Sequence, residues 1–243
     1  MTDQPQQAYD ASRYDRPSVT VDVVIFALKE RELHVLLVKR RNWPFEGYWA
    51  IPGGFIKMDE SLEESARREL EEETGVRDVY LEQLYTFGDP GRDPRTRVIS
   101  VAYFALIRPE TQTLRRSEES DDVRWFPVRE VPSPLAFDHD RILRYAEDRL
   151  RSKLEYSTIA FQLLPEVFTL LELKHIYEQI LGEELDKRNF YRKIREAGVL
   201  EDTGRMRGNR GRPARLYRFR RDRREGDFVF RWREARLHHE DAE

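Results

Sequence analysis

The sequence predicts an α+β domain followed by a separate small, basic domain. Three observations lead to this: strand-like runs interrupted by helices up to residue 154, a capped helix pair after residue 169, and a concentration of arginines beyond residue 186. The 243 residues allow two cores, since domains cluster at roughly 100–150 residues. We expect a flexible tail (1–17), an N-terminal domain (18–154), a DNA-binding domain (155–220) and a C-terminal extension (221–243).

Alternating apolar runs define the first domain. Val19–Leu28 and Leu33–Val38 flank a polar turn and predict a β-hairpin. The segment 42–54 is rich in glycine, proline and aromatic residues, which is typical of an ordered loop meeting a strand. Later apolar runs predict strands at Val79–Phe87, Val98–Leu106 and Val123–Pro127, and the spacing of apolar residues predicts a helix over Asp140–Leu154.

One helix has clear end signals in the sequence. Ser61 and Glu64 form a capping box at its start, and Gly75 suits the left-handed position that follows its last residue, Thr74. Within it, Glu69, Glu72 and Glu73 have the i, i+3, i+4 spacing that places three carboxylates on one face. Such a cluster is a solvated face or, where a cation neutralises it, a site for Mg²⁺, which prefers hard oxygen ligands.

The surroundings of these glutamates favour the metal site. Gly53 and Gly54 lack side chains and allow a close approach of backbone and substrate, and Arg68 can orient a glutamate or hold an anion. Together the stretch carries the full Nudix signature, at Gly54, Glu60, Arg68, Glu69, Leu70, Glu72, Glu73, Gly75 and Val76. Residues Val19 to Leu154 thus resemble a Nudix domain.

The Nudix resemblance implies an α/β/α sandwich and metal-assisted cleavage of a nucleoside diphosphate linked to another group. Glu69, Glu72 and Glu73 would bind Mg²⁺ or Mn²⁺, and Glu60 and Arg68 would support them as further catalytic residues. The general base stays unassigned.

Two segments outside the signature, PFEGYWAIPGGF and DPGRDPRTRVISVAYFAL, resemble the ADP-ribose branch of that family. Two interpretations stay open for their side chains. The aromatic ones line a ligand pocket or belong to the core: Phe45, Tyr48 and Trp49. The cationic ones reach a phosphate or a ribose, or lie in a solvated loop: Arg92, Arg95 and Arg97.

The second domain begins with another capping box, Thr169 with Glu172, on a helix with a broad apolar stripe. After a break at Gly182, a second helix starts at Asp186 and ends at Gly198. Its inward face carries Phe190, Ile194 and Ala197, and its outward face carries Arg188, Arg192 and Arg195, with Asn189 at the edge. This pattern predicts a helix-turn-helix with a cationic recognition helix.

A glycine- and arginine-rich segment, EDTGRMRGNRGRPARLYRFR, then predicts a basic β-hairpin wing. Between Asp186 and Arg220, twelve cations and four anions give a net charge of +8, whereas the rest of the chain carries −11 of the formal total of −3. This asymmetry indicates a local polyanion contact. We expect double-stranded DNA to bind at Lys187, Arg188, Asn189, Arg192, Arg195, Arg207, Arg210 and Arg212.

Nearly the whole chain resembles the Nudix-related transcriptional regulators of NAD metabolism. The resemblance lies in LAFDHDRIL, in the stretch from LPEVF to FYRKI, and in GRPARLYRF. It implies a repressor that binds a palindromic operator as a homodimer and whose DNA affinity changes with ADP-ribose or a related nucleotide. From its position alone, the helix over Asp140–Leu154 is our candidate for the lever between the domains.

Two other functions remain open. The chain could be an ADP-ribose pyrophosphatase with an accessory basic domain, or the same architecture could regulate carbohydrate genes through a sugar ligand. Every signature position is filled, which favours retained hydrolysis and argues against the sugar ligand. The lack of cysteine, of a signal peptide and of any apolar run near the roughly 20 residues of a membrane span indicates a cytoplasmic protein with no membrane partner.

Overall fold

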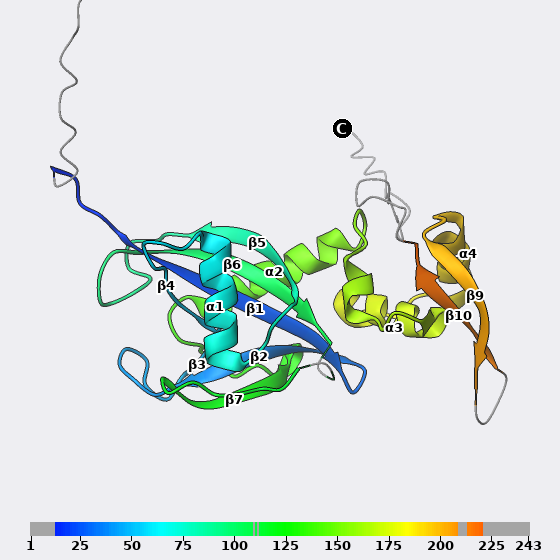
Figure 1. Cartoon of the computed structure of the whole chain (residues 1–243), viewed down its shortest axis with the longest axis horizontal. Coiled ribbons are helices and arrows are strands. Elements are labelled where there is room, and N and C mark those ends of the chain that lie inside the picture. Colours follow the sequence, from blue (N-terminus) through cyan, green and yellow to red (C-terminus); the bar gives the residue numbers. More distant parts are fainter. Residues whose placement is uncertain (1–12, 109, 111, 209–212, 221–243) are drawn as a thin grey trace, which may run out of the picture.

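The computed structural model describes residues 13–220, except 109, 111 and 209–212 (Figure 1). The predicted DNA contacts Arg210 and Arg212 lie outside the described residues, as do the C-terminal extension and the first twelve residues of the predicted tail. The remaining chain forms a Nudix-type sheet domain and a winged helix-turn-helix, as the sequence predicts.

A seven-stranded mixed sheet organises the first domain. The predicted hairpin is present as β1 (Ser18–Lys29) and β2 (Glu32–Arg40), which pair antiparallel. Strand β1 also runs parallel to β6 (Val98–Ile107), and β6 pairs antiparallel with β5 (Tyr80–Phe87). On the other side, β2 pairs with β3 (Trp49–Ala50) and β7 (Ser120–Pro127), and the short β4 (Gly53–Phe55) pairs with β1.

The two faces of β1 explain the layering. Alternate residues of a strand point to opposite faces, and in β1 both faces are buried. Val23 packs in a cluster with Leu70 of α1 (Leu62–Thr74), whereas Val24 packs in a cluster with Ile142 of α2 (His139–Lys153). The sheet therefore lies between two helices, in the expected α/β/α sandwich (Figure 1).

The ends of α1 follow the sequence signals. Ser61 Oγ accepts from the amide of Glu64, the Glu64 carboxylate accepts from the amide of Ser61, and Gly75 ends the helix at φ 78°. These bonds satisfy amides that the first helical turn leaves without partners. The two ends of α1 are thus fixed by bonds within a few residues of each other in the sequence.

The second domain contains the predicted helix pair and wing. Its elements in chain order are the 3₁₀ turn Ile159–Leu163, β8 (Phe168–Thr169), α3 (Leu170–Leu181), α4 (Lys187–Glu196), β9 (Leu200–Arg207) and β10 (Ala214–Phe219). A second 3₁₀ turn, Val128–Glu130, belongs to the first domain. Tyr177 of α3 packs against Phe190 of α4 with ring centroids 5.2 Å apart. Strands β8, β10 and β9 close a three-stranded sheet beside the helices.

The two domains share one hydrophobic cluster. Leu150 and Leu154, at the end of α2, belong to the same buried cluster as Leu173 and Tyr177 of α3. Two polar contacts add to this seam: His175 Nε2 donates to the carbonyl oxygen of Arg31 at 2.8 Å, and Arg151 Nε donates to that of Ile180 at 3.2 Å. The boundary at 154/155 stays a prediction, because the core does not break there.

Within the part of the chain that the structure describes, no helix is long and apolar enough to span a membrane.

Leu150→Ala should lower the free energy of unfolding by about 2–5 kcal/mol, because it opens a cavity where the side chain is fully buried. Urea denaturation followed by circular dichroism measures the loss. Leu171→Ala is the control: this leucine of α3 is 56% exposed, and the change should cost about 0.5 kcal/mol or less. Equal losses for the two variants would contradict the shared core.

Candidate functional site

Two carboxylates of α1 lie against the glycine pair between β3 and α1. The amide of Gly53 donates to Glu73 Oε2 at 2.8 Å. A Cβ on Gly54 would overlap the carboxylate of Glu69, and one on Gly53 would overlap the carbonyl oxygen of Val21. Gly53 is therefore required sterically, because a side chain there would push β4 away from the backbone of β1, whereas a side chain at Gly54 would displace the Glu69 carboxylate. The close approach that the sequence predicts is thus made by the protein's own carboxylates.

Arg68 connects the remaining acidic residues of the signature. Its Nε donates to Glu60 Oε1 at 2.8 Å, and its Nη1 donates to Glu69 Oε1 at 2.6 Å and Glu72 Oε2 at 3.1 Å. Its Nη2 reaches the carbonyl oxygen of Phe55 at 3.2 Å. The bond from Arg68 is the main cause that holds the pKa of Glu60 below its ordinary value. Glu60 and Arg68 therefore lie where a supporting role requires them.

The inner carboxylates are held in an unfavourable environment for negative charge. Burial raises the pKa of Glu73 to about 8, and the charges of Glu69 and Glu119 add to this effect. Burial also raises the pKa of Glu69, although Arg68 opposes the shift. Glu119 was not singled out from the sequence, and it lines the cavity beside Glu73. A cation placed among these groups would relieve the repulsion.

The donor set fits a divalent cation in part. Glu69 and Glu73 offer hard carboxylate oxygens beside the glycine pair, and Mg²⁺ commonly takes one or two carboxylates together with substrate phosphates. Glu72 points to Arg68 and is 57% exposed at its side chain. Within the described part of the chain, no three acidic or histidine side chains converge to hold a metal. Glu69 and Glu73 therefore lie at the glycine pair, and the metal role of Glu72 stays a prediction.

A cavity of about 110 Å³ opens next to Glu73. Its wall is acidic on one side, at Glu73 and Glu119, and cationic on the other, at Arg40 and Arg95. Phe137 lies between the arginines, with the guanidinium carbons of Arg40 and Arg95 at 5.0 and 5.6 Å from the ring centroid. Burial is the main cause that lowers the pKa of Arg40, and the charge of Arg95 lowers it further. The lining also holds Asp93, which pairs with Arg95 at 2.7 Å. An anionic ligand would therefore meet Arg40 and compete with Asp93 for Arg95.

The predicted ligand residues divide into two groups. Arg92 and Arg95 line the cavity, together with Gly53 and Gly54. The other three do not line it. Arg97 Nη1 contacts the carbonyl oxygen of Val98, Phe45 packs against Phe137 at 4.8 Å between centroids, and Trp49 packs against Phe126 at 4.8 Å. Phe45 and Trp49 thus pack against other aromatic rings, and their role in ligand binding stays a prediction.

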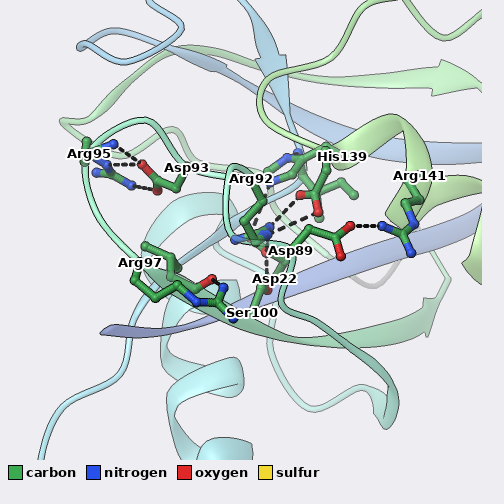
Figure 2. A network of polar contacts seen from close by, with 12 residues as sticks. Asp22, Asp89, Arg92, Asp93, Arg95, Arg97, Ser100, His139 and Arg141 are labelled. Carbon is green, nitrogen blue, oxygen red and sulfur yellow. Dashed lines mark hydrogen bonds and ion pairs between the residues drawn. The ribbon is translucent and has the colours of Figure 1, made fainter. Parts of the chain in front are cut away.

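Arg92 belongs to a buried polar network that sequence inspection missed (Figure 2). Its Nη2 donates to Asp138 Oδ1 at 2.7 Å and lies 3.4 Å from Asp22 Oδ2. Ser100 Oγ also donates to Asp22. His139 Nε2 lies 3.6 Å from Asp22 Oδ1, while its Nδ1 accepts from the amide of Ile51 at 2.9 Å. Arg92 is therefore neither solvated nor free: its side chain is 3% exposed.

The state of His139 follows from these contacts. Burial lowers its pKa, so the imidazole is neutral near pH 7. Because Nδ1 accepts a hydrogen bond, the proton lies on Nε2, which faces Asp22. One signal for this network was present in the sequence, namely Asp22 as a lone acid within the apolar run of β1.

The outward face of α4 is cationic, as expected. Phe190 and Ile194 are buried, and Asp186 caps the helix by accepting from the amide of Asn189 at 2.7 Å. Arg188 and Arg195 are exposed. Arg192 is exposed too, but its guanidinium donates to Glu196 at 3.0 Å and to Asn189 Oδ1 at 2.7 Å. Lys187 lies over the ring of Tyr191, with Nζ 5.7 Å from its centroid.

The wing arginines form ion pairs within the domain. Arg207 donates to Glu172 Oε1 at 2.7 Å and to the carbonyl oxygen of Val167 at 2.9 Å. Arg215 pairs with Asp202 at 2.7 Å, and Arg218 pairs with Glu201 at 2.6 Å. Exposed pairs of this kind contribute about 0–1 kcal/mol, so a DNA phosphate can compete for them.

Comparisons with known proteins agree with this architecture. Residues 16–146 match the NUDIX domain, and residues 160–219 match the NrtR DNA-binding winged helix domain. The ADPR responsive transcriptional repressor NtrR of Acinetobacter baylyi is 41% identical over 96% of this chain and 94% of its own length.

The chain belongs to the NrtR-type Nudix regulators.

Two solved structures support this NrtR-type assignment. The structure of Shewanella oneidensis NrtR with a 27mer DNA matches with a TM-score of 0.74 and 42% identity, covering 83% of this chain and 93% of that one. The NUDIX domain of the same protein complexed with ADP ribose matches with a TM-score of 0.53 and 40% identity, covering 59% of this chain and 94% of that one. The fold class and the order of the two domains are therefore confirmed.

The raised pKa of Glu73 makes the stability of this NrtR-type chain depend on pH in a defined direction. A carboxyl with a raised folded pKa stabilises the fold fully below its ordinary pKa of 4.5, and this contribution is lost as the pH rises toward about 8. Glu73→Gln removes the titration. At pH 8 and in the presence of a chelator, the free energy of unfolding of Glu73→Gln should therefore be about 1–3 kcal/mol higher than that of the unaltered protein.

Thermal denaturation at pH 5 and pH 8 measures this difference, which should be small at pH 5. Glu71→Gln is the control, since Glu71 is an exposed glutamate of the same helix. A pH-independent gap between Glu73→Gln and the unaltered protein would contradict the buried, protonated carboxyl.

Proposed function

We propose that this chain is an ADP-ribose-responsive transcriptional repressor of NAD metabolism genes, acting in the cytoplasm. It binds double-stranded operator DNA through α4 and the β9–β10 wing, and ADP-ribose in the Nudix domain lowers that affinity. One observation carries the proposal. A charged cavity and a cationic recognition helix lie in two domains that share a hydrophobic core. A ligand can act on DNA binding only through such a connection.

The chemistry of the cavity supports a nucleotide ligand. A diphosphate carries negative charge that Arg40 and Arg95 would balance, and Phe55 and Phe137 offer ring faces beside them. The cavity volume of about 110 Å³ is below the roughly 300–1,000 Å³ of ligand pockets. We therefore assign it to the diphosphate with its cation, and the nucleoside extends beyond it.

The metal and the assembly belong to the same proposal. Glu69 and Glu73 would hold Mg²⁺ or Mn²⁺ against the phosphates, and Glu60, Arg68 and Glu72 would position them. Operator sites for helix-turn-helix proteins commonly mirror a two-fold dimer. We therefore propose a homodimer in which each α4 enters the major groove of one half-site.

A second candidate function is retained hydrolysis of ADP-ribose. The observation that favours it is the complete signature, with Glu69 and Glu73 at the glycine pair and Arg68 holding Glu60. Bound metal would polarise a phosphate and lower the pKa of an attacking water. Attack at one phosphorus breaks the bond to the bridging oxygen and yields AMP and ribose 5-phosphate. The protein would then destroy its own signal.

ADP-ribose with Mg²⁺, added to the complex of the full-length protein with its upstream DNA, should lower the bound fraction. Fluorescence anisotropy follows the DNA, and chromatography of the same samples follows AMP. Dissociation with slow AMP release is the result expected for a sensor that clears its signal, and Glu73→Gln should stop the release. AMP release without specific DNA binding at any nucleotide concentration would contradict the repressor function and identify the protein as a hydrolase.

Arg188→Ala should weaken operator binding about 10-fold or more, because this exposed arginine lies on the outward face of α4. Arg129→Ala is the matched control. That arginine is 70% exposed at its side chain but lies in the Nudix domain, so its removal should change operator affinity less than about 2-fold. Equal effects of the two substitutions would show that α4 is not the recognition helix.

A further inference from the structure

We propose that Asp138 is a positioning residue that couples the nucleotide cavity to the DNA-binding domain by exchanging its partner. Without nucleotide it holds Arg92; with nucleotide it caps α2. The inference rests on the proposed function and adds its mechanism of regulation. It requires a cavity-lining group that Asp138 holds, an alternative partner for Asp138, and a path from α2 to the second domain.

The cavity side of the exchange is Arg92. Its guanidinium lines the cavity and donates to both oxygens of Asp138, from Nη2 at 2.7 Å and from Nε at 3.1 Å (Figure 2). With His139 neutral, the network holds two carboxylates, Asp22 and Asp138, and one cation, Arg92. A diphosphate entering the cavity would meet Arg40 and Arg95 as well, and at Arg92 it would be a third negative group beside Asp22 and Asp138. It would therefore compete with Asp138 for the guanidinium.

The alternative partner is the start of α2. Aspartate at the N-cap normally accepts a hydrogen bond from an amide two or three residues later. Ser61, Thr169 and Asp186 make this bond for α1, α3 and α4. Among the α-helices of the described residues, α2 is the one without it, although Asp138 occupies its N-cap. The carboxylate that would cap α2 is used by Arg92 instead.

The backbone at this point also differs from an ordinary N-cap. Asp138 has φ −101° and ψ 23°, whereas the capping residues of the other α-helices are extended. Phe137, immediately before it, has φ 56°, in the left-handed region that is unfavourable for a residue with a side chain. Phe137 also lines the cavity between Arg40 and Arg95. Capping of α2 would require the backbone to rotate here, and so would alter the direction in which the helix starts.

The path to the second domain is α2 itself. Leu150 and Leu154 at its other end are fully buried in the cluster that contains Leu173 and Tyr177 of α3. Arg151 Nε donates to the carbonyl oxygen of Ile180 in the last turn of α3. Beside this seam lies a groove of about 700 Å³ lined by both domains, with Glu147 and Lys174 on its walls. Packed helices transmit a shift as a unit, and the groove leaves room for it.

Asp138→Asn tests the exchange in the full-length protein. Asparagine caps helices as well as aspartate does but loses the ionic bond to Arg92. The substitution should therefore shift the protein toward the nucleotide-bound arrangement. Operator affinity without ADP-ribose should fall to within about 3-fold of that of the saturated unaltered protein, and the ADP-ribose affinity should be unchanged or tighter. Anisotropy with operator DNA and calorimetry with ADP-ribose and Mg²⁺, completed before measurable AMP release, give both constants.

Asp89→Asn is the matched control. Asp89 pairs with Arg141 in the first turn of α2, both side chains are more than half exposed, and Asp89 is not part of the cavity wall (Figure 2). The same charge change should leave the ratio of operator affinities with and without ADP-ribose within about 2-fold of the unaltered value. A merely structural defect at Asp138 would weaken nucleotide and DNA binding together, and that result would overturn the proposal.

The outcomes distinguish a failure of the Asp138 exchange from a failure of the repressor function. If ADP-ribose changes the operator affinity of the unaltered protein and of Asp138→Asn by the same factor, the exchange is wrong while the repressor stands. If it changes neither, both fail. Should Asp138→Asn not fold, Arg151→Met decides, since it keeps the aliphatic stem and removes the bond to Ile180. Arg151→Met should reduce the ratio of operator affinities without and with ADP-ribose by about 3-fold or more and leave the ADP-ribose affinity unchanged. An unchanged ratio would overturn the proposal.

Discussion

The contact between the acidic face of α1 and the glycine pair of β4 is the constraint on which the Nudix domain depends. Two carboxylates that would otherwise be hydrated lie against backbone, and one of them accepts the amide of Gly53. This places buried carboxyl groups beside the charged lining of the cavity, which includes Arg40, Arg95 and Glu119. The raised pKa of Glu73 and the ring of bonds around Arg68 both follow from that placement. A site that binds a cation and a diphosphate needs such an imbalance before the ligand arrives.

The same sheet connects the site to the rest of the molecule. Strand β1 carries Asp22 into the polar network and packs through its apolar residues against both α1 and α2. Helix α2 then continues into the core of the winged helix-turn-helix. The two functions of the chain therefore do not occupy separate bodies joined by a linker. They lie at opposite ends of one helix.

Local signals explain what the sequence made predictable. The capping boxes at Ser61 and Thr169, the left-handed Gly75 and the apolar run of β1 act within a few residues, and the structure has each of them. The network around Arg92 joins residues that lie 46 and 70 positions apart, so no local pattern contains it. Trp49 was ambiguous for the same reason, because Phe126, which packs against it, comes from a distant segment. The partner of Arg207, Glu172, is also distant in sequence and was not predicted.

The ion pairs on the DNA-binding surface have a consequence for how the protein searches a genome. Arg192, Arg207, Arg215 and Arg218 each have a carboxylate partner in the free protein. A random stretch of duplex offers phosphates to these arginines but must first displace their internal partners, so part of the attraction is cancelled. Only a sequence that adds contacts at base edges recovers the difference. If DNA binds at this surface as proposed, the acidic residues would weaken residence on non-cognate DNA and shorten the time spent away from the operator.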